Sequence, residues 1–95
     1  MRYGGGVWRE LVWTDASEAH IARHHVTPAE VEEIVNTRPR WEHPGAEDSL
    51  LVYGQTLAGR YLLAVLAESM DGRWYVATAR DQMTSEARTF REKGH

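Results

Sequence analysis

Residues 20–31 read His20-Ile21-Ala22-Arg23-His24-His25-Val26-Thr27-Pro28-Ala29-Glu30-Val31, and they predict a corner between two helices. Thr27 is a suitable N-cap, Pro28 suits the first helical position, and Glu30 stands where it completes a capping box. Three histidines and one arginine precede this helix start. Groups that hold phosphate or move protons therefore gather at a point where the direction of the chain is fixed.

The helix that starts at this corner is expected to run from Pro28 to about Thr37, because Pro39 prevents its continuation. Its apolar residues have the spacing of one buried stripe, made of Val31, Ile34 and Val35. Its acidic residues are expected to lie on the solvated face, and they are Glu30, Glu32 and Glu33.

The chain before the corner predicts one strand and one helix. Trp8–Trp13 is rich in aromatic and β-branched residues and contains no breaker, which is typical of a strand. A helix is expected over about residues 16–24, with Asp15 or Ser17 as its cap. The glycine-rich start, residues 1–6, is expected to be a flexible lead-in.

The second half of the chain predicts three consecutive strands and a closing helix. The strands are expected over residues 49–57, 61–67 and 73–79. Ala58-Gly59 and Asp71-Gly72 are turn pairs that join antiparallel strands. The middle strand is apolar on both faces, so we expect it at the centre of the sheet. The helix is expected to start at Asp81 or Thr84 and to continue to about Glu92.

The order β-α-α-β-β-β-α predicts a single α+β domain, residues 1–95, because a chain of this length rarely supports two cores. We expect an antiparallel sheet with the two N-terminal helices on one face and a C-terminal helix. Arg40–Glu42 is a candidate for a further short strand. The composition, 42% hydrophobic and 26% charged, is that of an ordinary globular protein.

Composition also excludes several classes of protein. The chain has no cysteine, so disulfides and thiolate metal ligands are excluded. No apolar run reaches the length of a membrane span and no signal peptide is recognised, so a cytoplasmic location without membrane contact is expected. The net charge of −3 gives no general attraction to nucleic acid, so RNA binding would require a local basic patch.

Six motifs occur in order along the chain: Trp13-Thr14-Asp15, His20–His24, Val26–Ile34, Gly54–Arg60, Thr78-Ala79-Arg80 and Met83–Arg88. Together they cover roughly residues 11–91 and resemble the BrnT-like toxins, a family similar to the RelE-like ribonuclease toxins. Three positions depart from the pattern: His25 stands where the family usually has glycine, Ala87 where arginine is common, and Phe90 where tyrosine is common.

The resemblance implies a toxin-like endoribonuclease of a bacterial type II toxin–antitoxin system, which inhibits translation by cleaving RNA without a metal or cofactor. It also implies a RelE-like fold and a cognate ribbon-helix-helix antitoxin as protein partner. DNA would be contacted only indirectly, through the antitoxin.

Metal-independent RNA cleavage requires a base, an acid and cations that hold the charge growing on the phosphate. Histidine suits the first two roles, and the forked arginine side chain suits the third. The candidate catalytic residues are His20, Arg23, His24, Arg60 and Arg80. The candidate substrate-binding residues are Arg60, Arg80, Arg88 and Tyr53, and no metal site is expected.

Each candidate also has a purely structural interpretation. Of His20 and His24, one would pack against the sheet while the other is solvated. Arg60 would form an ion pair with an acid on a neighbouring element. Arg88 would belong to a solvated helix face, and Tyr53 would only pack.

Two functions follow from these alternatives. One is the endoribonuclease, and the other is a catalytically degenerate binding module of the same fold that acts through a protein partner. A basic cleft that joins Arg23, Arg60 and Arg80 would favour the enzyme, whereas scattered arginines would favour the binding module. A structural homodimer built on exposed aromatic residues is a third interpretation.

Overall fold

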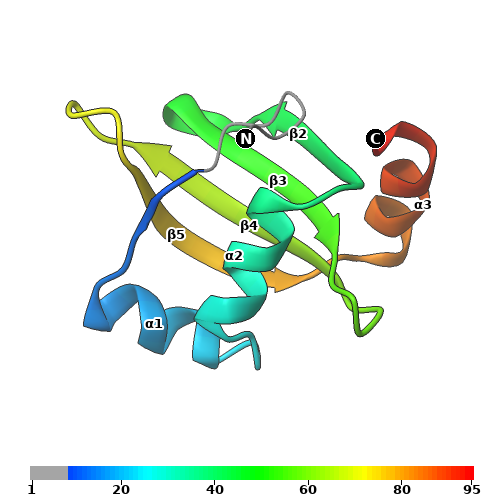
Figure 1. Ribbon diagram of the computed structural model, residues 1–95, viewed down its shortest axis with the longest axis horizontal. Coiled ribbons are helices and arrows are strands. Elements are labelled where there is room, and N and C mark those ends of the chain that lie inside the picture. Colours follow the sequence, from blue (N-terminus) through cyan, green and yellow to red (C-terminus); the bar gives the residue numbers. More distant parts are fainter. Residues whose placement is uncertain (1–8) are drawn as a thin grey trace, which may run out of the picture.

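Helices pack on a five-stranded mixed sheet in the computed structural model, which describes residues 9–95 (Figure 1). The strands are β1 (Leu11–Val12), β2 (Arg40–Pro44), β3 (Ser49–Gln55), β4 (Tyr61–Glu68) and β5 (Trp74–Asp81). The helices are α1 (Asp15–Ala22), α2 (Pro28–Asn36), a 3-10 turn (Ala46–Asp48) and α3 (Thr84–Lys93). The strand order is β1-β5-β4-β3-β2, so the predicted α+β class is confirmed for this part of the chain.

The predicted meander of three strands is confirmed. β3, β4 and β5 pair antiparallel in chain order, and β4, the doubly apolar strand, lies at the centre of the sheet. Both turn pairs are present, with the left-handed φ values that favour glycine at Gly59 (98°) and Gly72 (85°).

The first strand is shorter than predicted, and it makes the sheet mixed, because three of the four described strand pairings are antiparallel and its own is parallel. β1 contains only Leu11–Val12, and it pairs parallel to β5. The strand does not begin at Arg9, because the side chain of Asn36 binds both the backbone N–H and the backbone carbonyl of that residue. It ends at Val12, and Thr14, two residues later, already caps α1. Trp8 and the predicted lead-in lie outside the described residues.

The candidate strand at Arg40–Glu42 is real and extends to Pro44 as β2. It pairs antiparallel with β3 and forms one edge of the sheet. Its first residue also exchanges two backbone hydrogen bonds with His95, so the end of the chain is fixed beside this edge.

Side-chain capping determines where the first two helices begin. Thr27 and Glu30 form the predicted capping box at the start of α2. The cap of α1 is Thr14, with Ser17 as its partner, and not Asp15 or Ser17 as predicted. α3 begins after Met83, whose backbone N–H donates to Glu86 Oε1 at 2.7 Å.

The two faces of the sheet carry different helices. α1 and α2 cover one face, as predicted, and the core between them contains Ile21, Val26, Val31, Ile34, Val35, Val52, Leu62, Ala64, Leu66, Val76 and Ala79. α3 packs on the other face through Phe90, which is buried against Tyr53 and Leu63. We call this second side the α3 face. In Figure 1, α3 lies beside one end of the sheet, next to β2.

Gly54 brings α2 close to the sheet. A Cβ atom at this position would lie 2.7 Å from the Cβ of Ile34, so no larger residue fits without movement of the helix. No helix of the described residues is long and apolar enough to cross a membrane.

Candidate functional site

The structure separates the predicted arginines into two clusters. The first, which we call the Arg60 cluster, contains Arg60, Glu30 and Asp81. The second, which we call the Arg80 cluster, contains Arg80 and Glu86 with Tyr53 nearby. Both lie at the end of the sheet where β5 finishes.

In the Arg60 cluster, the guanidinium donates to oxygens of Glu30, Asp81 and His25. Its Nη1 donates to the two carboxylate oxygens of Glu30 at 3.0 and 3.1 Å and to the His25 carbonyl at 2.7 Å. Its Nε donates to Asp81 Oδ1 at 3.2 Å. The structural interpretation of Arg60, an ion pair with acids on neighbouring elements, is therefore confirmed.

The pKa values of this cluster follow the same contacts. The backbone hydrogen bond from Thr27 lowers the pKa of Glu30, and the hydrogen bond and charge of Arg60 lower it further. Glu30 therefore closes the helix cap and holds the arginine at the same time.

The glutamates of α2 do not form the solvated face that was predicted, because each of them is bound to another part of the chain. Glu30 accepts from Arg60. Glu32 accepts a hydrogen bond from the Trp13 indole, and Glu33 accepts one from the Leu57 backbone.

In the Arg80 cluster, the arginine and Glu86 form a two-pronged ion pair. Nη1 and Nη2 of Arg80 donate to the two oxygens of Glu86 at 2.8 and 2.9 Å, and Nη1 also donates to the Asp81 carbonyl at 2.9 Å. The hydrogen bond with Arg80 lowers the pKa of Glu86, and in return it raises the pKa of Arg80. Glu86 also accepts the Met83 backbone N–H, so the ion pair fixes the first turn of α3 against β5.

Tyr53 lies beside this pair but is mostly packed. It is 7% exposed and stacks on Trp41, with ring centroids 4.8 Å apart. Burial raises the pKa of its hydroxyl, and the charge of Glu86 adds to that effect. The phenol therefore stays protonated at neutral pH.

Strand geometry keeps the two clusters apart. Arg80 and Asp81 are consecutive residues of β5, so their side chains project to opposite faces of the sheet. Asp81 holds Arg60 on the side of α2, whereas Arg80 meets Glu86 on the α3 face. The described residues thus do not form one cleft that contains both arginines.

The histidines at the corner between α1 and α2 lie on the surface. His20 and His24 are both exposed, with ring centroids 5.9 Å apart, so the prediction that one of them packs against the sheet is wrong. Arg23 on the same corner and Arg88 on α3 are exposed too, and neither forms an ion pair with another described residue. His25 occupies the turn between the helices with φ 60°.

Sequence reasoning missed the acids that hold the two arginines. Glu30 was recognisable only as a cap, and Asp81 only as a possible helix start. One signal for the Arg80–Glu86 pair was available: Arg80 stands at the end of a predicted strand, and Glu86 stands six residues later, in the first turn of the following helix.

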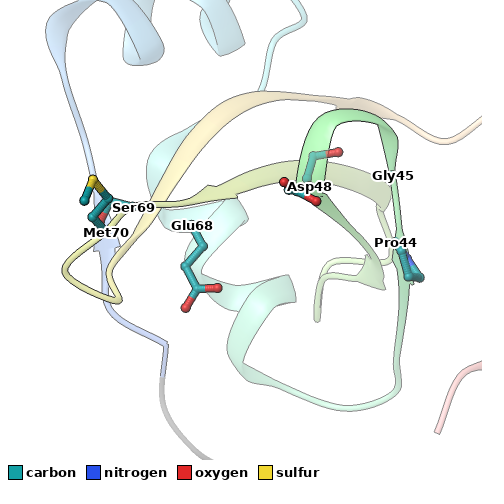
Figure 2. A pocket seen from close by; sticks show the side chains of 7 residues that line it. Pro44, Gly45, Asp48, Glu68, Ser69 and Met70 are labelled. Atoms are coloured by element: carbon teal, nitrogen blue, oxygen red, sulfur yellow. The ribbon is translucent and has the colours of Figure 1, made fainter.

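A cavity that no prediction included lies at the opposite end of the sheet (Figure 2). It is open, has a volume of about 600 Å³, and is lined by Pro44, Gly45, Asp48, Ser49, Glu68, Ser69 and Met70. Its charged groups are the carboxylates of Asp48 and Glu68, so it disfavours anions such as phosphate. We call it the acidic pocket.

Within residues 9–95, no group of three or more histidine, aspartate or glutamate side chains is placed to hold a metal ion. Comparisons of the chain with protein-family models, with curated proteins and with solved structures find no match.

Proposed function

We propose that this protein is the toxin-like member of a type II toxin–antitoxin pair and that it acts by binding its protein partner, without cleaving RNA. The resemblance to BrnT-like toxins supports the class of system, and with it a bacterial, cytoplasmic location. One observation supports binding in place of catalysis: Arg60 and Arg80, the central candidates for phosphate contact, are both held by carboxylates of the same chain.

The charge balance of the clusters carries this argument. The Arg60 cluster contains one arginine and two acids, so its formal charge is negative, and the Arg80 pair is neutral. A phosphate would have to displace a carboxylate that already makes charge-assisted hydrogen bonds of 2.8–3.1 Å. Because that carboxylate is tethered to the same fold, it competes at a high effective concentration.

The endoribonuclease stays the second candidate, because the Arg80 cluster holds the right kinds of group. A cation, a carboxylate and a protonated phenol meet there at one edge of the α3 face. In that case phosphate would replace Glu86 on Arg80, and the released carboxylate would be available as a base.

Expression in bacteria separates the two candidates. We expect that induction of the protein alone leaves growth equal to that of an empty-vector control, at confirmed soluble expression. The protein of the adjoining reading frame is expected to co-purify with it.

Arg80→Ala and Arg38→Ala provide the matched comparison, since Arg38 is exposed and lies outside both clusters. If the parent arrests growth, and Arg80→Ala relieves the arrest while Arg38→Ala does not, the binding module is refuted and the ribonuclease is established.

A further inference from the structure

The α3 face is only half covered in the part of the chain that the structure describes. Cross-strand pairing sets its side chains in rows, and the row Trp41, Tyr53, Leu63 and Arg80 lies beneath α3. The next two rows are His43, Leu51, Val65 and Thr78, and then Ser49, Ala67 and Tyr75. Of these seven residues, His43 and Ala67 are exposed and the rest are half-buried. We call these two rows the uncovered rows.

Four of the seven residues of the uncovered rows are apolar or aromatic, and none is a lysine or an arginine; the four are Leu51, Val65, Ala67 and Tyr75. An apolar sheet face is normally covered by another layer of structure, and exposed apolar patches mark interaction sites. RNA is a poor fit, because a strand of phosphates needs cations and the nearest arginine, Arg80, is neutralised by Glu86.

The acidic pocket borders this surface at Ser49. Ser49 lines the pocket and is also the strand partner of Ala67 in the second uncovered row. Asp48 and Glu68 lie on its two sides, one from the β2–β3 connection and one from the end of β4 (Figure 2). The apolar surface therefore ends in a hollow that attracts a positive side chain.

We propose that the uncovered rows dock an amphipathic helix of the protein partner, with a lysine or arginine at one end of that helix in the acidic pocket. This inference rests on the proposed partner-binding function. The four strands of a row span about 14 Å at the usual strand spacing, which about ten residues of helix cover. A second copy of this chain fits less well, because it carries a net charge of −3 and would bring further acids to an acidic rim.

The test uses the purified protein of the adjoining reading frame as the probe, titrated against the full chain by calorimetry. Ala67→Asp places a charge in the second uncovered row at an exposed position, so the variant is expected to fold. Val65→Asp places a charge in the first row, at a half-buried position. Ala58→Asp is the matched control, because Ala58 is equally exposed but lies in the β3–β4 turn at the other end of the sheet.

We expect Ala67→Asp and Val65→Asp each to weaken binding at least tenfold and Ala58→Asp to leave it unchanged. The double variant Asp48→Asn, Glu68→Gln is expected to weaken binding several-fold and to reduce its salt dependence, because a charge contact is lost. Thermal melts verify that each variant is folded.

Tight binding that neither Ala67→Asp nor Val65→Asp changes would place the partner elsewhere and overturn the docking surface, while the proposed function would stand. Absence of binding by the parent would overturn both. If the parent protein sediments as a dimer and the Ala67→Asp variant sediments as a monomer, a second copy of the chain occupies the surface.

Discussion

His25 carries a local conflict between side chain and backbone at the corner of α1 and α2. Its φ is 60°, in the left-handed region that suits glycine. The neighbouring backbone explains why this conformation is required. The N–H of Val26 donates to the Ile21 carbonyl at 3.1 Å and that of His25 to the Ala22 carbonyl at 3.0 Å, which is the Schellman pattern of a helix end. Val26 and Ile21 are both buried in the core, so packing holds the turn in place.

We predict that His25→Gly raises the free energy of unfolding by about 0.5–1 kcal/mol, because the left-handed strain is relieved and outweighs the greater freedom of glycine in the unfolded chain. Urea denaturation monitored by tryptophan fluorescence measures the change. His24→Gly is the control one residue earlier, where φ is not positive, and it is expected to lower stability. Equal effects of the two substitutions would contradict the argument.

At the level of helices and strands, the sequence predicted what local signals determine. The cap at Thr27, the turn glycines and the apolar middle strand each depend on neighbours within a few residues, and each was confirmed. The late start of β1 was not predictable, because it depends on Asn36, a residue 27 positions away that binds the backbone of Arg9. The carboxylate that holds Arg60 was not predictable for the same reason, since Glu30 lies 30 residues earlier on α2.

Glu42 on β2 connects its own strand with the segment before β1. It accepts hydrogen bonds from Arg9 at 2.6 and 2.9 Å and from Arg40 at 2.9 Å, and it thereby ties the segment before β1 to β2. The hydrogen bond with Arg9 lowers the pKa of Glu42 below its ordinary value of 4.5, despite the opposing effect of burial. A carboxylate with a lowered pKa in the folded state stabilises the fold above its unfolded pKa. That contribution is lost as the pH falls through the folded value.

We predict that Glu42→Gln lowers the free energy of unfolding by about 0.5–1 kcal/mol at pH 7, because the ion pairs are partly exposed. The difference from the parent is expected to shrink as the pH falls from 4.5, where the unfolded carboxylate takes up its proton, through the lower pKa of the folded carboxylate. Denaturation curves at pH 7, 5 and 3 provide the measurement. Glu68→Gln, which removes an exposed carboxylate without an ion pair to a described residue, is expected to have little effect at any pH. A difference that persists unchanged at pH 3 would disprove the role of the Glu42 charge.

For the whole molecule, the balance of charge and exposed surface favours a protein partner over RNA. The net charge is −3, the two best-placed arginines are neutralised, and the acidic pocket lies at the far end of the sheet from them. Composition alone indicated that RNA binding would need a local basic patch. Which arginines are free was beyond sequence reasoning, because it depends on pairs brought together by the sheet register and by α2.

We therefore predict that the parent shows no saturable binding of fluorescein-labelled single-stranded RNA below about 100 µM at physiological salt, the weak end of non-specific affinity. The double variant Glu30→Gln, Glu86→Gln removes one carboxylate from each arginine, so that Arg60 keeps Asp81 and Arg80 keeps no acid, and it is expected to bind measurably. Its salt dependence should have a logarithmic slope of about −1.4, the value for two phosphate contacts on a single strand. Glu18→Gln, Glu68→Gln is the matched control, because it removes the same number of charges from exposed positions outside both clusters. If both double variants gain affinity equally, net charge alone is responsible. If instead the parent binds RNA with micromolar affinity and Arg80→Ala abolishes this binding, phosphate displaces Glu86 from Arg80. The charge of the clusters would then no longer speak against a ribonuclease.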